Sequence, residues 1–533
     1  MELASDSLSL TVRPVLIVFC LLAFLWTRRL SAKNSRLPLP PGPSGLPVIG
    51  NVLDIPLEDM EVYLHGLSVK YGEIISLKIF GTPMIVLGTH EAAVELLEKR
   101  SSIYSDRNMT PTAELAGFDW LIGMMRYGAR WRKLRGVFHR CMNPNAIVQY
   151  RPIQETEVKK YLLRLLEDPV KFYEHGRHLI GAIIIRVSYG LEVIGGNDKY
   201  IKLAEDTMEC FNTVFQPGRY LVQTFPSLRH IPSWFPGAGF RREFAAWFPV
   251  VRKLHEVPWE AAMTARREGH VPRSIVTTLM DRAEVWEDEE AAQAAAANAY
   301  MGEKVPLVIL WHLSPSMSSK LPEPTLSTLQ TFFAALASNP RIQKRAQDAL
   351  DSMVGSDRLP TMEDQPDLPY ITAIAKECLR WRSVVPLAVP HIATQEDEYK
   401  GYRIPAGSVV IANTWAYSRD TRYYPDPETF QPERFLLESG ELNPDVLDPA
   451  EMAFGYGRRI CPGRHFAEAS LFTIIASVLH TFDISAPLDK DGNPVKLDVK
   501  MTNGVVSYPE PFACTIRPRS ATAEALIRAN ASA

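Results

Sequence analysis

The longest apolar run of the sequence stands close to its first residue. Residues Pro14 to Trp26 are apolar apart from Cys20, and extension back to Leu8 gives about 19 residues, enough to span a bilayer. Acidic residues precede the run and basic residues follow it: Glu2 and Asp6 before, Arg28, Arg29, Lys33 and Arg36 after. By the positive-inside rule, residues 1–27 form a membrane anchor and the body lies in the cytosol. A cleaved signal peptide is the alternative, but the acidic start and the missing small-residue cleavage site favour the anchor.

Beyond a basic and proline-rich hinge over 28–50, helical spacing of apolar residues dominates the chain. Helices are predicted over 58–71, 90–99, from 127 onward, and over 154–166, 181–191, 200–214, 239–266 and 371–382. Short strands are predicted over 74–80 and 84–87, a hairpin over 402–405 and 408–413, and a last β element from 495–506 and 512–517. Residues 518–533 are small and polar, which predicts a flexible tail.

Composition narrows the class of protein. The 533 residues are 46% hydrophobic and 22% charged, which is ordinary for a globular enzyme. A net charge of −3 gives no indication of a nucleic-acid partner. The six cysteines are scattered without a CxxC pair, which fits a reducing compartment: Cys20, Cys141, Cys210, Cys378, Cys461 and Cys514.

One of these cysteines, Cys461, lies in a loop rich in glycine and arginine. Residues 454–463 read Phe-Gly-Tyr-Gly-Arg-Arg-Ile-Cys-Pro-Gly, and an apolar helix follows from His465. A position just ahead of a helix N-terminus favours thiolate over thiol. The glycines let something flat approach closely, and the arginines provide charge for an anionic partner. A lone thiolate argues against zinc and suits an axial ligand to a haem iron, whereas a buried, inert cysteine is the alternative.

This loop resembles the cysteine-ligand loop of cytochrome P450, the haem-thiolate monooxygenase family, with the pattern Phe-x-x-Gly-x-Arg-x-Cys-x-Gly. Every position of the pattern is filled, by Phe454, Gly457, Arg459, Cys461 and Gly463. The resemblance covers about residues 36 to 515, with the motifs in the family's order. It implies a mainly α fold with a small β lobe, and haem b as cofactor with Cys461 as the axial ligand to its iron.

Further haem contacts follow from the same resemblance. Trp131 and Arg135 lie four residues apart on one helix face, as in the family's Trp-x-x-x-Arg, where both side chains bind a haem propionate. His391 follows a proline-flanked segment at a position where the family places a propionate-binding His or Arg. Arg459 is expected to neutralise a propionate as well, and Phe454 to pack on the cysteine side of the macrocycle. The alternatives are a surface Trp/Arg stack and a surface histidine.

Three charged residues are expected to be structural. Glu377 and Arg380 form an i, i+3 pair on one predicted helix, and Arg434 lies in Pro432-Glu-Arg-Phe. They resemble the family's Glu-Arg-Arg network, which ties that helix to the segment before the cysteine loop. On this interpretation they fix the position of the thiolate and take no part in the chemistry.

The chain departs from the family at 303–324. The family's central helix carries Ala/Gly-Gly-x-Asp/Glu-Thr-Thr, whose acid and first threonine deliver protons to dioxygen. Here four prolines at 306, 315, 322 and 324 cannot sit in one continuous helix. If 303–321 is set aside, Glu323 falls on the acid, Pro324 on the proton-relaying threonine and Thr325 on the next position. We therefore treat 303–324 as an anomalous insertion in a catalytic domain over 51–517, with Glu323 and Thr325 as candidate catalytic residues.

The resemblance implies a membrane-anchored monooxygenase that hydroxylates or epoxidises a lipophilic small molecule with O2 and electrons from NADPH. Its expected partners are NADPH-cytochrome P450 reductase and cytochrome b5, and its expected place is the endoplasmic reticulum membrane. The apolar stretch 221–240, broken by proline and glycine, resembles a family segment that covers the substrate entrance and dips into the membrane; a buried core loop is the alternative. The general character of the sequence is similar to that of fungal family members in secondary metabolism, which often act on terpenoids. Alternatives are a haem-thiolate isomerase, dehydratase or peroxygenase, or an inactive haem-binding product of a faulty gene model.

The insertion is either a real segment that bulges the helix or translated non-coding sequence, and the second explanation leads to a prediction about the transcript. Its lack of periodicity and its clean boundaries are typical of translated non-coding sequence, so we expect the mature message to lack the codons for residues 303–321. The working protein would then have an unbroken helix with an acid–threonine pair. Sequencing of the transcript checks this, and a mature message that encodes 303–321 would exclude it.

Overall fold

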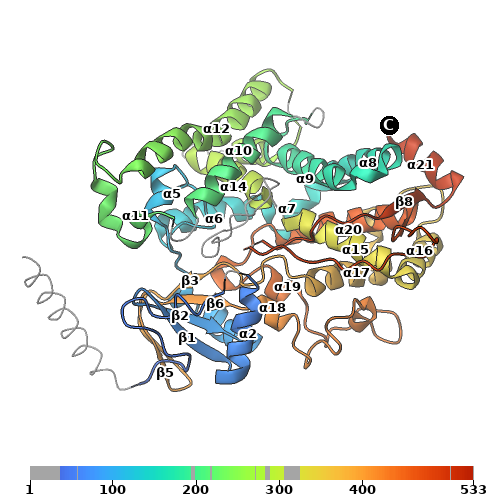
Figure 1. Ribbon diagram of the computed structural model, residues 1–533. Helices are drawn as coiled ribbons and strands as arrows, with labels where there is room; N and C mark the ends of the chain where they lie inside the picture. The colour runs from blue at the N-terminus through green and yellow to red at the C-terminus, as the bar shows by residue number, and fades with distance from the viewer. Residues whose placement is uncertain are drawn as a thin grey trace, which may run out of the picture.

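Helices make up most of the molecule in this computed structural model, and most of its short strands gather in a separate lobe (Figure 1). The structure describes residues 37–56, 58–193, 198–215, 219–270, 272–281, 289–304, 324–504 and 506–531. The predicted anchor over 1–27 and the first part of the predicted hinge lie outside these ranges. Within them, no helix is both long enough and apolar enough to cross a bilayer.

A helix without charged residues lies at the centre of the fold. Helix α15 spans Pro324–Ser338, and its side chains from residue 325 to 337 are all buried. A helix that is apolar on all sides is stable only when other elements enclose it. Helix α15 packs against α9 (Phe172–Tyr189), α17 (Pro369–Trp381) and α20 (Arg464–Thr481). The middle tier of the molecule in Figure 1, with α15, α17 and α20, is built in this way.

A second tier of helices covers the first. Its longer members are α6 (Ala129–Met142), α8 (Arg151–Glu167), α10 (Lys199–Val214), α12 (Gly239–Arg267) and α14 (Glu289–Lys304). Helix α10 packs on α12, and α14 packs on α6, α9 and α12. The predicted helices over 154–166, 200–214 and 239–266 are confirmed, and the predicted helix over 181–191 is the second half of the longer α9.

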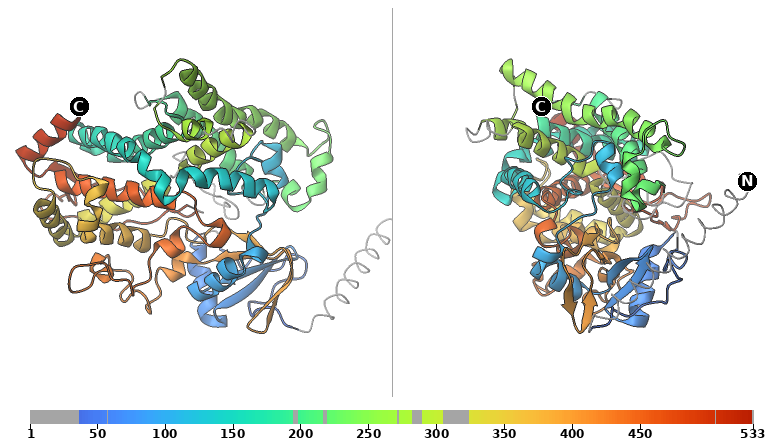
Figure 2. Two further views of the ribbon diagram at one scale, coloured as in Figure 1. Left: turned by 180° about the vertical axis from the view of Figure 1, so that it is seen from behind. Right: turned by 90° about the vertical axis from the view of Figure 1, so that its left-hand side faces the viewer.

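Strands β1 to β6 form the lobe below these tiers, and the views in Figure 2 show the same arrangement. The main sheet has the order β1-β2-β6-β3. Strands β1 (Ile74–Ile79) and β2 (Thr82–Leu87) pair antiparallel, which confirms the two strands predicted there. Strand β6 (Val409–Ala412) runs parallel to β2, and β3 (His391–Ile392) closes the other side of β6. Helix α2 (Met60–Tyr71) contributes Met60 and Leu64 to the small core beneath the sheet.

The predicted hairpin over 402–405 and 408–413 is wrong. Strand β5 (Tyr402–Ile404) pairs with β4 (Asp397–Tyr399) across a tight turn at Lys400 and Gly401, both with positive φ. Strand β6 is apolar along its whole length, so it is paired on both sides inside the main sheet. The turn chemistry of Lys-Gly is weaker than that of Asn-Gly, and Ala406-Gly407 was the more visible turn signal in the sequence.

The end of the chain also differs from the prediction. Strand β8 (Thr515–Pro518) pairs with β7 (Phe482–Ser485), and the described residues of 495–506 contain an isolated bridge at Met501 instead of a strand. The predicted flexible tail over 518–533 contains helix α21 (Ala521–Ala531), which packs against α8 and α20. Burial of Ala523 and Ile527 on one helix face accounts for its order.

Candidate active site

The cysteine loop connects a short helical turn to the long helix α20. A 3-10 turn covers Gly457–Arg459, and α20 begins at Arg464, three residues after Cys461. The backbone N–H of Cys461 donates to the carbonyl of Phe454 at 2.7 Å, which closes the loop on itself. The Cys461 side chain is exposed in the described structure, unlike those of Cys141, Cys210 and Cys378. The loop therefore leaves the Cys461 sulfur accessible next to a closed backbone turn.

Gly457 lies where the loop touches the β lobe. Its φ is +54°, and a Cβ at this position would stand 2.4 Å from the Leu97 carbonyl oxygen and 3.1 Å from the Glu98 Cα. Leu97 and Glu98 belong to the helical turn η1 (Val94–Lys99). Only glycine allows both this backbone conformation and this close approach. The family motif residue thus has a local structural cause in this chain.

Arg459 is held by the backbone of a distant loop. Its Nε donates to the Ser105 carbonyl at 2.6 Å, Nη1 to Ile122 at 3.1 Å and Nη2 to Met125 at 2.8 Å. Its guanidinium also stacks over the ring of Trp131, 4.3 Å from the ring centroid. Burial lowers the pKa of Arg459 to about 10, and the negative charge of Asp106 raises it in part.

Trp131 and Arg135 both contact the same region from helix α6. The buried Trp131 donates from Nε1 to the Ile122 carbonyl at 3.2 Å, and Arg135 donates from Nη2 to the Ile460 carbonyl at 2.5 Å. Burial lowers the pKa of Arg135, and the field of Cys461 acts in the opposite direction. The structure therefore brings Trp131, Arg135 and Arg459 together beside Cys461. The surface-stack alternative for the Trp/Arg pair is wrong because Trp131 is only 4% exposed.

His391 comes from the other side of the site, on β3. Its ring is buried, and Nδ1 lies 2.6 Å from the Tyr104 carbonyl oxygen, so this nitrogen carries the proton. Burial, and then the positive charge of Arg107, lowers the pKa of His391 well below its usual value. The alternative of a surface histidine is wrong.

Arg107 is the residue of this group that the sequence did not reveal. It is buried, and its Nη1 donates to the carbonyls of Val389 at 3.1 Å and Pro390 at 2.8 Å. Its Nε has no hydrogen-bond partner among the described residues. Burial, and then the neighbouring Arg459, lowers the pKa of Arg107. A single arginine in a polar stretch carries no sequence signal, and only the bridge between Asp106 and Ile392 brings it beside His391.

The charges of this group fit a ligand with two carboxylates. Arg107 is buried, Arg135 and Arg459 are half-buried, and no described carboxylate lies within 4.0 Å of their guanidinium nitrogens. Buried cations without a counter-charge are costly, so an anionic partner would stabilise them. Haem b carries two propionates, and arginine suits carboxylates. These side chains and the accessible sulfur of Cys461 fit the predicted cofactor.

The three residues expected to be structural form a buried network. Glu377 and Arg380 are both 0% exposed, and Arg380 donates to the two Glu377 oxygens at 2.7 and 2.8 Å. Arg434 donates to Glu377 Oε1 at 3.2 Å, and the Gln431 backbone N–H donates to the same oxygen at 2.8 Å. The network thus links α17 to the turn over Pro432–Phe435 that precedes the cysteine loop.

The two candidate catalytic residues have different outcomes. Glu323, like most of the predicted insertion over 303–324, lies outside the described residues. Thr325 is the second residue of α15 and is buried. Pro324 begins that helix, and proline suits the first helical position because the backbone N–H that it lacks would have no partner within the helix there. The geometry therefore places Thr325 at a helix start, and its catalytic role stays a prediction.

Comparison with known proteins identifies similar chains. A family model described as Cytochrome P450 matches residues 40–293 and 322–515. Two cytochrome P450 monooxygenases of Coprinopsis cinerea are 39% identical over 500 residues (93% of this chain, 92% of the relative) and 38% identical over 524 residues (97% and 98%). One of Armillaria gallica is 38% identical over 531 residues, covering 98% of this chain and 99% of the relative. The unmatched stretch 294–321 includes most of the predicted insertion.

The contact of Gly457 with η1 leads to a prediction. Gly457→Ala should lower the free energy of unfolding by roughly 2–5 kcal/mol, from a strained positive φ and an overpacked backbone contact. Chemical denaturation of the holoprotein measures this. The matched control is Gly455→Ala, where φ is also positive but the nearest atom to the added Cβ is 3.9 Å away. The control should cost about 1–2 kcal/mol, and an equal loss in both variants would contradict the role of the close approach.

Proposed function

The chain belongs to the cytochrome P450 family, and on that premise we propose that it is a membrane-associated monooxygenase that hydroxylates or epoxidises a lipophilic small molecule. The observation that carries the proposal is the intact cysteine loop, with its accessible sulfur beside a partly buried cationic group. The family binds haem through a cysteine thiolate, and the bound haem supplies the oxygen-activating chemistry. The chain's own residues hold the cofactor, exclude water and position the substrate.

The residues around Cys461 have separate tasks in this proposal. Arg107, Arg135 and Arg459 would neutralise the two carboxylates, and Trp131 would keep the Arg459 guanidinium in place by stacking. His391 would donate to a carboxylate from Nε2 only when both of its ring nitrogens hold protons. The Glu377–Arg380–Arg434 network would hold the Pro432–Phe435 turn against α17 and so fix the segment that leads into the cysteine loop. Phe454 would pack beside the sulfur, and Glu323 and Thr325 would deliver protons.

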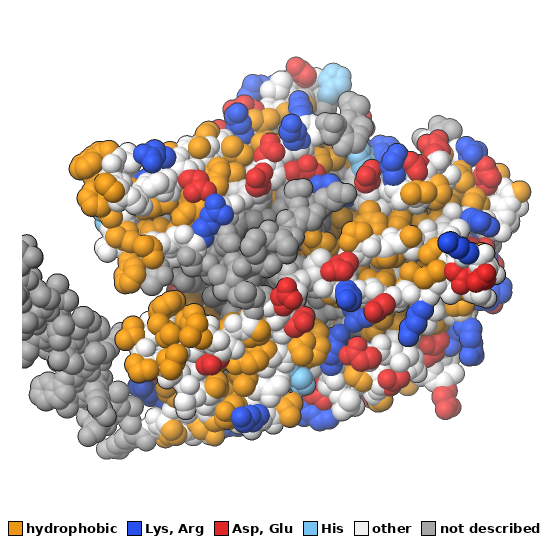
Figure 3. Space-filling view, in the orientation of Figure 1, with side chains coloured by type: hydrophobic (Ala, Val, Ile, Leu, Met, Phe, Trp, Pro, Cys, Tyr) orange, Lys and Arg blue, Asp and Glu red, His pale blue; other side chains and the backbone are white. Residues whose placement is uncertain are grey.

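Apolar side chains on one edge of the molecule support association with a membrane. Four are exposed near the start of α12 and four in the β lobe: Leu221, Phe225, Trp234 and Phe235, then Leu46, Val48, Leu53 and Phe80. Figure 3 shows hydrophobic surface on the left edge of both the upper helices and the lower lobe. Exposed apolar surface of this extent is typical of an interaction site. The exposure of Trp234 and Phe235 also contradicts the alternative that 221–240 is a buried core loop.

A basic surface beside the cysteine loop supports an acidic redox partner. The side chains of Arg132, Lys133, Arg140 and Arg458 are exposed there, and Arg458 and Arg132 both contact Tyr127, next to α6. Positive charge around a redox centre steers an acidic partner into place. We propose NADPH-cytochrome P450 reductase as electron donor, with cytochrome b5 as a second partner, at the endoplasmic reticulum membrane. On the resemblance to fungal members of secondary metabolism, we propose a lipophilic substrate of that metabolism, of the terpenoid class.

The monooxygenase proposal is tested by spectroscopy and labelled oxygen. The reduced protein should give the shifted carbon monoxide band of thiolate ligation, and Cys461→Ala should lose it. Cys514→Ala is the control, since Cys514 is also not paired in a disulfide and should leave the band unchanged. With NADPH and reductase, one atom of labelled dioxygen should enter the product. Turnover that persists without NADPH and reductase would favour an isomerase, dehydratase or peroxygenase instead.

The membrane anchor has its own test. The full chain should stay with the membrane fraction after alkaline extraction, because a spanning apolar segment is not released by loss of charge contacts. Deletion of residues 1–27 should release the protein or leave it extractable by salt. Release of the full chain under alkaline conditions would contradict the anchor.

A further inference from the structure

One buried amide side chain connects the helix α14 to a loop of the haem site. Asn298 is 8% exposed, and its Oδ1 accepts the backbone N–H of Ile122 at 2.8 Å. Its Nδ2 donates to the Trp120 carbonyl at 3.1 Å and to the Ala294 carbonyl of its own helix at 2.8 Å. Because the Ile122 N–H can only donate and the Trp120 carbonyl can only accept, the orientation of the amide is fixed.

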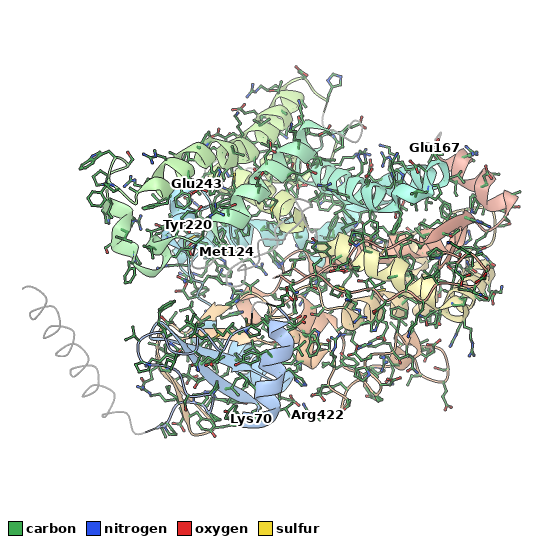
Figure 4. All side chains as sticks on the ribbon, in the orientation of Figure 1. Lys70, Met124, Glu167, Tyr220, Glu243 and Arg422 are labelled. Atoms are coloured by element: carbon green, nitrogen blue, oxygen red, sulfur yellow. The ribbon has the colours of Figure 1, made fainter. Side chains whose placement is uncertain are left out.

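The same loop contacts the cysteine loop through its carbonyl groups. We define the 118–125 loop as the residues between Phe118 and Met125; Figure 4 labels Met124 between the upper helices and the β lobe. The Ile122 carbonyl accepts from Arg459 at 3.1 Å and from Trp131 at 3.2 Å, and the Met125 carbonyl accepts from Arg459 at 2.8 Å. One residue, Ile122, thus binds Asn298 through its N–H and Arg459 through its carbonyl.

A second contact of the loop with the upper helices involves rings alone. The Trp120 ring lies against His255 of α12, with ring centroids 5.0 Å apart, and both side chains are buried. Their Trp120 Nε1 and His255 Nε2 atoms have no partner in the described part of the chain. This contact packs the loop but does not fix the direction of its peptide groups. The Asn298 hydrogen bonds do fix that direction, because both bonds are buried and directional.

We propose that Asn298 is a positioning residue for the Arg459 guanidinium. It holds the Ile122 peptide so that its carbonyl meets Arg459 and Trp131, and Arg459 is then aimed at a haem carboxylate. Without the amide, the 118–125 loop loses its orientation, Arg459 loses a fixed acceptor, and the protein holds the haem less tightly. Cys461 is untouched by this change and keeps its ligand role. The inference rests on the haem site and does not require the oxygenation reaction.

The test compares Asn298→Ala with a matched variant of the same helix. In the control, Gln293→Ala, α14 loses a hydrogen bond of 3.1 Å to the His255 backbone carbonyl of α12. That bond has no atom of the 118–125 loop, and the ring contact of His255 with Trp120 remains. Transfer of haem from each holoprotein to an acceptor protein gives the rate of haem loss, and hydrogen exchange reports the Ile122 amide. We expect about tenfold faster haem loss in Asn298→Ala, the effect of one hydrogen bond, that of Arg459 to the Ile122 carbonyl, and faster exchange at Ile122. Gln293→Ala should change neither.

A conservative variant separates positioning from general destabilisation. Asn298→Asp keeps an acceptor for the Ile122 N–H but loses the donor to Trp120, so it should protect the Ile122 amide and lose haem more slowly than Asn298→Ala. The carbon monoxide band should stay at the same position in all three variants, since Cys461 is unchanged. If Asn298→Ala does not fold, Asn298→Asp compared with wild type gives the same test, with haem loss expected to rise. Haem loss no faster in the Asn298 variants than in Gln293→Ala would overturn the proposal, as would faster haem loss without faster exchange at Ile122 in Asn298→Ala. None of these measurements depends on substrate turnover, so they can fail while the monooxygenase proposal stands.

Discussion

Positive charge that is partly or fully removed from water, with no carboxylate in ion-pair contact, is the constraint on which the site depends. Arg107 and Arg135, from two separate parts of the chain, lie beside Arg459 of the cysteine loop, and no described carboxylate is within ion-pair distance of the three. Such an arrangement is costly by itself and becomes favourable when an anion arrives. The cofactor thus completes the electrostatics of the fold as well as providing its chemistry. The loops around the site are arranged so that this group of cations stays in place beside Cys461.

The protein holds these cations with backbone carbonyls instead of acidic side chains. Five carbonyl groups of three segments receive the hydrogen bonds of Arg107 and Arg459: Ser105, Ile122, Met125, Val389 and Pro390. A carbonyl satisfies the directional demand of a guanidinium without cancelling its charge. The charge therefore remains available to a ligand. An acidic residue in the same place would have given a stronger internal bond and a poorer haem site.

Local features of this fold could be predicted from the sequence, and features that depend on distant segments could not. The cysteine loop, the pair on α6 and the network around Glu377 occupy short, patterned stretches, and the structure brings each set together. Arg107 could not be found, because its position beside His391 depends on a strand pairing between distant segments. The hairpin predicted at 402–413 is wrong for the same reason, because β6 pairs with the distant strand β2 and with β3 instead of with β5. The order of α21 rests on a surface that α8 and α20 provide, which the tail sequence alone does not show.

The cysteine loop also runs from one hydrophobic core to another. Tyr456 belongs to the core of the β lobe together with Leu96 and Leu97, whereas Phe466, five residues after Cys461, belongs to the main helical core. Proteins often open in cooperative units that follow such cores. Because the loop is anchored in both, neither unit can open without moving the backbone that carries the sulfur. The cysteine therefore lies on the boundary between two cooperative units. A local opening of the β lobe would displace Cys461 while the helical core is still packed.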